Sequence, residues 1–129
     1  MNRHNIRNIL LALMMLSCSR GLMTHDAVRE AAEQYYTMLI EGDYRGFVNG
    51  YADAASMPED FRRQLEDAVA QFMAKDDMRS LCRVEATGDS LSQDSTAYVR
   101  LLLHFSDSTS EQIGLSLILG KDGWKMWAH

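Results

Sequence analysis

Apolar residues recur every three or four positions from Val28 to Leu39, a spacing that predicts an amphipathic helix. Thr24 stands before this run as an N-cap, and Gly42 follows it as a C-cap. Asp43 is then in position to cap a second, shorter helix. The apolar face of that second helix consists of Tyr44, Phe47, Val48 and Tyr51.

A third helix is predicted from Ser56 to about Met73. Ser56 and Glu59 have the spacing of a capping box, and Pro58 falls in the first turn. Because its large apolar residues share one face, we expect the helix to bury them and to help fill the space beside the sheet. That face consists of Phe61, Leu65, Ala68, Val69, Phe72 and Met73.

After residue 79 the apolar period falls to two residues, which is typical of strands. The alternation predicts strands over 82–86, 97–105, 113–119 and 124–127, and we interpret Gly88-Asp89-Ser90 as a turn or irregular link. The apolar alternate positions of these strands predict an inner face of the sheet that has no carboxylate and no histidine. We expect Cys82 to be a buried, inert thiol on this face. That face consists of Cys82, Val84, Ala86, Ala97, Val99, Leu101, Leu103, Phe105, Ile113, Leu115, Leu117, Leu119, Trp124 and Met126.

Three helices followed by an antiparallel meander of about four strands predict an α+β domain with the helices packed on one face of the sheet. The order of elements, Gly42-Asp43 after the first helix and Asp122-Gly123-Trp124 in the last hairpin resemble the nuclear-transport-factor-2-like superfamily, also called cystatin-like or ketosteroid-isomerase-like. The resemblance covers about residues 24–128 and extends to small bacterial lipoproteins that carry this domain without an assigned activity. It implies a curved sheet around a long first helix, with a cone-shaped cavity. Members include isomerases, dehydratases, ligand binders and interaction modules, so the fold does not choose the function.

The N-terminus has the pattern of an export signal. Residues 1–8 are polar and basic, and the apolar run over 9–16 is shorter than the roughly 20 residues that a membrane-spanning helix needs. The Ser17-Cys18 junction that follows resembles the lipobox of bacterial lipoproteins, which implies cleavage before Cys18 and acylation of its thiol. The alternatives are an ordinary cleaved signal and a buried N-terminal helix.

This pattern predicts three parts: a signal peptide over 1–17, a lipidated cysteine with a short tether over 18–23, and one domain over 24–129. The expected location is the cell envelope, with the domain anchored to a membrane through the lipid on Cys18. No acidic cluster follows Cys18, which favours the periplasmic side.

Charge argues against nucleic-acid binding. The chain has 13 Lys and Arg against 18 Asp and Glu, and two of the arginines lie in residues 1–17, so the remainder has 11 basic and 18 acidic side chains. A domain this acidic repels polyanions. We interpret Arg62-Arg63, an adjacent basic pair, as part of a solvated helix face.

Candidate chemistry is sparse, and we predict no catalytic residue, no metal site and no cofactor. His25, His104 and His129 lack a second ligand at metal-binding spacing. A general base must reach its substrate, and the predicted inner face supplies none. Once Cys18 carries lipid, Cys82 has no partner for an internal disulfide.

Two surfaces remain as candidates for binding. If the cone is open, its expected walls are Tyr35, Tyr36, Tyr51, Trp124 and Met126. The outward parity of the strands mixes aromatic, aliphatic and Arg side chains, a composition typical of interfaces, and predicts a homodimer. Its candidate residues are Tyr98, Arg100, Leu102, His104, Ile118 and Trp127.

The sequence therefore favours a non-catalytic envelope protein that acts by interaction or assembly, with a filled cone. Binding of a small apolar ligand or peptide in the cone is the second reading. An isomerase or dehydratase is the third.

Overall fold

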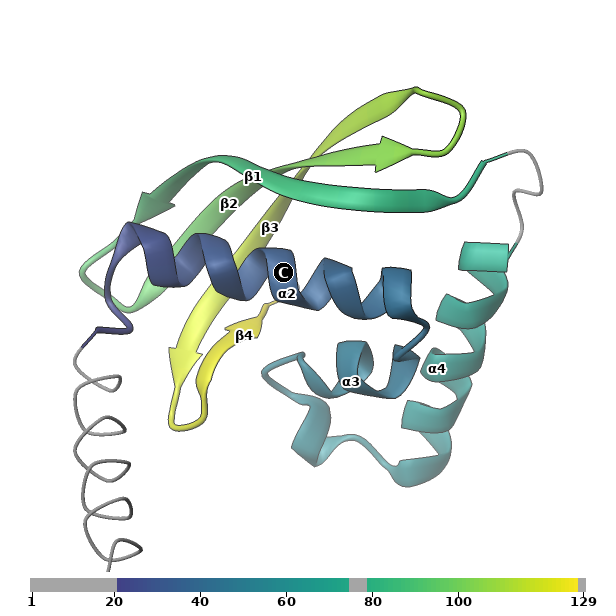
Figure 1. Cartoon of the computed structure of the whole chain (residues 1–129). Coiled ribbons are helices and arrows are strands. Elements are labelled where there is room, and N and C mark those ends of the chain that lie inside the picture. The colour runs from purple at the N-terminus through teal and green to yellow at the C-terminus, as the bar shows by residue number, and fades with distance from the viewer. Residues whose placement is uncertain (1–20, 75–78, 128–129) are drawn as a thin grey trace, which may run out of the picture.

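A computed structural model describes residues 21–74 and 79–127 of the chain (Figure 1). The predicted signal peptide and the predicted lipid attachment site at Cys18 lie outside these residues. The helices are α2 (His25–Glu41), α3 (Tyr44–Asn49), a short 3-10 helix η1 (Ala54–Ser56) and α4 (Glu59–Ala74). The strands are β1 (Leu81–Leu91), β2 (Thr96–Phe105), β3 (Ser110–Gly120) and β4 (Gly123–Met126).

The four strands form one antiparallel sheet in the order β1-β2-β3-β4, so each strand pairs with its neighbour in sequence. Figure 1 shows the sheet curving around α2, with α3 and α4 beyond the C-terminal half of that helix. The prediction of an α+β domain with three helices and a curved antiparallel sheet is confirmed. Within the described residues, no helix is long and apolar enough to cross a membrane.

The predicted caps of the first two helices are present. The Thr24 hydroxyl accepts a hydrogen bond from the amide of Ala27 at 3.1 Å, and Gly42 ends α2 with φ of 79°. The Asp43 carboxylate accepts from the amide of Gly46 at 3.0 Å and so caps α3. These contacts are local in sequence, which is why the pattern alone predicts them.

The predicted capping box of the third helix is wrong. Ser56 is the last residue of η1, and its hydroxyl donates to the carbonyl of Asp53 at 2.8 Å. Because η1 takes up Ser56, α4 begins only at Glu59.

Two register shifts in β1 correct the predicted pattern of that strand. One falls between Leu81 and Arg83 and places Cys82 outside the regular alternation, so its thiol is exposed rather than buried. The other falls between Ala86 and Gly88. Residues 88–90, which the sequence predicts to be a turn, are therefore part of the strand, and Asp89 pairs with Val99 on the inner face.

The core lies between α2 and the concave face of the sheet. Its most deeply buried side chains include Val28 on α2, Leu101 on β2 and Leu117 on β3, each 0% exposed. The buried core cluster runs from Val28 to Met126, so the fragment 19–129 contains every one of its contacts. The α4 helix has no buried residue, which contradicts the predicted burial of its apolar face.

Candidate functional site

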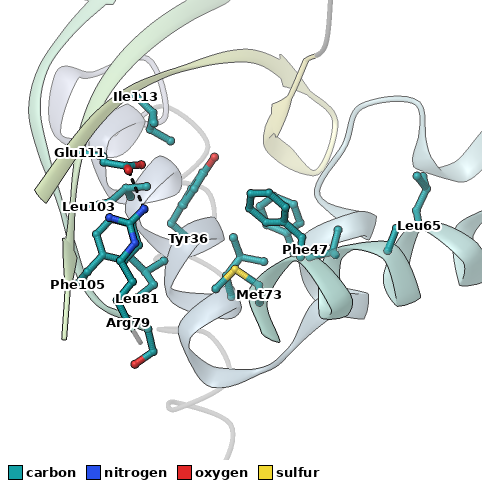
Figure 2. Close-up of a pocket in the computed structure, with 15 residues that line it drawn as sticks. Tyr36, Phe47, Leu65, Met73, Arg79, Leu81, Leu103, Phe105, Glu111 and Ile113 are labelled. Atoms are coloured by element: carbon teal, nitrogen blue, oxygen red, sulfur yellow. Dashed lines mark hydrogen bonds and ion pairs between the residues drawn. The ribbon is translucent and has the colours of Figure 1, made fainter. Parts of the chain in front are cut away.

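A cavity of about 810 Å³ opens at the end of the sheet that α4 faces. Its walls come from α2, α3, α4 and the inner face of β1, β2 and β3. Figure 2 shows this cone cavity, with Leu65 at one end, Arg79 and Glu111 at the other, and Tyr36, Phe47 and Met73 between them. The size is within the range of cavities that hold small molecules.

The α4 helix supplies the wall opposite the sheet. Leu65, Val69 and Phe72 line the cavity, but Phe72 remains 76% exposed. The helix packs mainly on α3, as its place in Figure 1 also shows. The expectation that the large side chains of this helix fill the cone is therefore wrong: they border an open cavity.

An aromatic row runs from the cavity wall along α3: Tyr36 and Phe47 line the cavity, and Tyr51 lies outside the lining. The rings of Tyr36 and Phe47 meet edge to face at 5.8 Å, and those of Phe47 and Tyr51 meet in the same way at 5.9 Å. Burial, with a smaller effect from Tyr51, raises the pKa of Tyr36 to about 12. The Tyr36 phenol therefore stays neutral at physiological pH.

One ion pair stands at the end of the cavity opposite Leu65, which we call its mouth because Glu111 is 50% exposed there (Figure 2). An Nη of Arg79 donates to Glu111 at 2.7 Å, and the other Nη donates to the hydroxyl of Thr109 at 3.2 Å. The guanidinium also lies 4.0 Å from the centroid of the Phe105 ring. These contacts fix the Arg79 side chain at the end of the sheet, where 28% of it is exposed.

The five residues predicted to line the cone lie at different sites in the structure. Tyr36 lines the cone cavity. Tyr35 and Trp124 border a smaller groove of about 410 Å³ along α2, and the Tyr35 hydroxyl donates to the carbonyl of Trp124 at 2.5 Å. Tyr51 forms a parallel bridge with Met126, which is 0% exposed in the core.

A second carboxylate on the inner face, Asp89, holds the start of α2. Its side chain is 1% exposed, and it accepts a hydrogen bond from Arg29 Nε at 2.5 Å and another from His25. Burial alone would raise the pKa of Asp89, but the hydrogen bonds and charges of His25 and Arg29 outweigh it and lower the pKa from its ordinary value. The prediction of an inner face without carboxylates is therefore wrong.

Asp89 and Glu111 both serve as partners of cations. Glu111 lines the cone cavity, and Asp89 is held against α2 at the far end of β1. The two carboxylates therefore act as ion-pair anchors for Arg79 and α2. Among the described residues, no group of three His, Cys, Asp or Glu side chains gathers as metal ligands would.

The outer face of the sheet carries the six predicted interface residues. Tyr98 and Trp127 are 47% and 41% exposed. Tyr98 lies against Gly114, where a Cβ would come within 1.7 Å of its hydroxyl, and Arg100 lies in the same way against Gly88. The two glycines let these long side chains lie flat on the sheet. Arg100 is exposed, and the other three, Leu102, His104 and Ile118, are half-buried.

Three polar side chains form a row across that outer face. The Glu85 carboxylate lies 2.8 Å from His104 Nε2, and the Ser110 hydroxyl lies 3.1 Å from His104 Nδ1. The hydrogen bond from His104 lowers the pKa of Glu85. With a proton on Nε2, His104 donates to Glu85 and accepts from Ser110, so one tautomer satisfies both contacts.

Sequence reasoning did not find the ion pair at the mouth or the Asp89 anchor. Glu111 lies two residues before Ile113 on β3, so the alternation of the strand places it on the same face as Ile113. Extending the predicted strand by two residues would have predicted its inward position. No comparable signal exists for Asp89, because the shift between Ala86 and Gly88 alone brings it inward.

Comparisons with known proteins bear on the fold. No protein-family model matches the chain, and no curated protein matches it. Among solved structures, it is similar to one described as a "Putative NTF2-like transpeptidase" from Campylobacter jejuni, with a TM-score of 0.63 and 15% sequence identity. The similarity covers 78% of this chain and 96% of that one. The curved sheet, the three helices and this similarity together show that the chain has the NTF2-like fold.

Proposed function

We propose that this chain is a lipid-anchored domain of the bacterial cell envelope that binds a small apolar ligand in the cone cavity without catalysing a reaction. The open cavity of about 810 Å³ is the observation that carries this proposal. A filled cone would have favoured a purely structural role, and the walls provided by α4 leave it open.

The lining supports an apolar ligand. Most of the lining side chains are aliphatic or aromatic, including Leu39, Phe47 and Leu103 from three different elements. Transfer of apolar surface from water to such a site is favourable by about 25 cal/mol per Å². The two carboxylates of the inner face are held by Arg29 and Arg79, which favours binding over general base catalysis.

The binding test uses the fragment 19–129 and the neutral dye N-phenylnaphthylamine, whose fluorescence rises in apolar sites. We expect the wild-type fragment to bind the dye and Ala68→Trp to lose most of that binding, because Ala68 lines the cavity. Gln71→Trp is the matched control, since Gln71 lies on the same helix but is not part of the lining. Equal binding by both variants, with unchanged circular dichroism, would place the dye elsewhere and contradict the proposal.

The lipid anchor is the second part of the proposal and rests on the sequence. A basic start, a short apolar run over 9–16 and Ser17-Cys18 occur together, as in lipoprotein signals. Several acyl chains would make anchoring stable, since each buried CH₂ contributes about 0.8 kcal/mol. We expect the full chain to fractionate with membranes and Cys18→Ser to lose its acyl mass in intact-protein mass spectrometry. A wild-type mass equal to that of the chain without acyl groups would exclude acylation at Cys18.

Assembly through the outer face of the sheet is a second candidate function. The exposure of Tyr98 and Trp127 on the outer face of the sheet favours it, because aromatic residues are enriched at interfaces. We expect a dimer in native mass spectrometry and a monomer after Trp127→Glu. A monomeric wild type at micromolar concentration would leave ligand binding as the proposed function.

The name of the Campylobacter jejuni protein raises transpeptidation as an alternative. A serine nucleophile needs an adjacent base, and Ser110 lies within hydrogen-bond reach of His104. This pair lies on the outer face, whereas the cone cavity opens on the inner face. We therefore expect a fluorophosphonate probe to leave Ser110 unlabelled, and labelling that Ser110→Ala abolishes would favour an enzyme.

A further inference from the structure

The polar groups of the cone cavity gather at its mouth. Arg79, Ser80 and Glu111 occupy one end, and the remainder of the lining is apolar except for the neutral phenol of Tyr36. Figure 2 shows Arg79 and Glu111 beside Phe105 and Leu81, well separated from Leu65 at the opposite end. A ligand that fills this space needs a polar head at the mouth and an apolar chain along α4.

The Arg79 charge is already engaged at the mouth: it pairs with Glu111, and it also lowers the pKa of Asp107. Arg79 is held by Glu111 at 2.7 Å and by Thr109 at 3.2 Å, and it stacks on Phe105. A ligand carboxylate that approached Arg79 would lie beside the Glu111 carboxylate, and a ligand ammonium would lie beside the guanidinium. Either charged head must break the ion pair or accept a like charge next to it.

An uncharged head avoids both penalties. An ionised carboxylate has about four lone-pair positions, so Glu111, which is 50% exposed, has capacity to accept from a ligand while it holds Arg79. The Ser80 side chain at the same end adds a hydroxyl. A hydroxyl or primary amide head fits these partners without a change in net charge.

We propose that the cone cavity selects a single-chain amphiphile with an uncharged hydrogen-bonding head, such as an amide or an alcohol, over a fatty acid or a long-chain amine. This inference rests on the proposed apolar ligand binding and names its ligand class. The Arg79–Glu111 pair is the specificity determinant, and the apolar walls supply affinity without preference for the head.

The test is displacement of bound N-phenylnaphthylamine from the fragment 19–129 by three ligands with one chain: dodecanamide, dodecanoic acid and dodecylamine. The amide is used below its solubility limit, and the other two are used below their critical micelle concentrations. At neutral pH we expect dodecanamide to bind at least about tenfold more tightly than either charged ligand, since a poorly paired charge at a partly buried site weakens binding by about that much. Glu111→Gln should then favour dodecanoic acid. Arg79→Gln should favour dodecylamine.

Glu66→Gln is the matched control, because it removes the same charge from α4 at a residue outside the lining. It should keep the preference for dodecanamide. Equal affinities for the three ligands, a preference of the wild type for a charged one, or no displacement of bound dye would each overturn this inference and leave the proposed function standing. Failure of the wild type to bind the dye would overturn both.

Discussion

The helices α2 and α4 have similar lengths and similar amphipathic patterns, but their apolar faces differ in burial. On α2, Val28 and Ala32 are 0% exposed and Leu39 is 8% exposed. On α4, no residue is buried, and Phe61 and Phe72 are 46% and 76% exposed. The contrast shows that an apolar stripe predicts a helix face without predicting what covers it.

The difference follows from what each helix faces. The sheet curves around α2, and the Tyr35 hydroxyl and the Asp89 carboxylate tie that helix to β4 and β1 (Figure 1). The α4 helix instead packs mainly on α3, and its apolar face borders the cone cavity. We therefore interpret α2 as the structural helix of the fold and α4 as a wall of the candidate site.

The largest expected effect comes from one substitution made in both helices. Leu39→Ala removes a buried side chain of α2 and should lower the free energy of unfolding by about 2–5 kcal/mol. Leu65→Ala removes a half-buried side chain of α4 and should lower it by less than about 1 kcal/mol. Urea unfolding followed by circular dichroism measures both. Equal losses would mean that α4 packs in solution as closely as α2 does.

The next effect concerns the anchor that holds α2 to β1. Asp89→Asn keeps the shape of the side chain and removes its charge, so stability at neutral pH should fall by about 1–3 kcal/mol. In the wild type the folded state lowers the pKa of Asp89 from its ordinary 3.8. The contribution of this group is therefore complete above that value and is lost as pH falls from it through the lower pKa of the folded state.

Unfolding curves at a series of pH values test this direction of change in stability with pH. The wild type should lose more stability than Asp89→Asn as pH falls from about 5 to 3. Asp26→Asn is the matched control for removal of a carboxylate, since Asp26 is exposed on the same helix, and at neutral pH it should lose less stability than Asp89→Asn. Parallel curves for wild type and Asp89→Asn would show that the anchor adds no stability.

Local signals in the sequence predicted much of the fold. The caps at Thr24 and Asp43 join groups three residues apart, and the alternation from Ala97 to Phe105 matches the burial of β2. Asp89 escaped prediction because its position depends on a register shift, which apolar alternation does not encode.

The candidate site was harder to predict than the fold, because it depends on which elements meet. Of the expected wall residues only Tyr36 lines the cone cavity, and the partner of Arg79, Glu111, lies 32 positions away in the sequence. The open cone itself follows from the position of α4, which the helical period of its apolar residues does not determine.

The smallest expected effect on stability separates folding from binding most sharply. Phe72→Ala should change the free energy of unfolding by less than about 0.5 kcal/mol, because the ring is 76% exposed and little apolar surface returns to water. The same ring lines the cone cavity, so dye affinity should fall several-fold while the fold is unaffected. A loss of stability comparable to that of Leu39→Ala would show that α4 closes onto the sheet in solution, and the cavity would then need a ligand to open it. Unchanged stability with weaker binding would show that the apolar face of α4 contributes to ligand binding and not to the core.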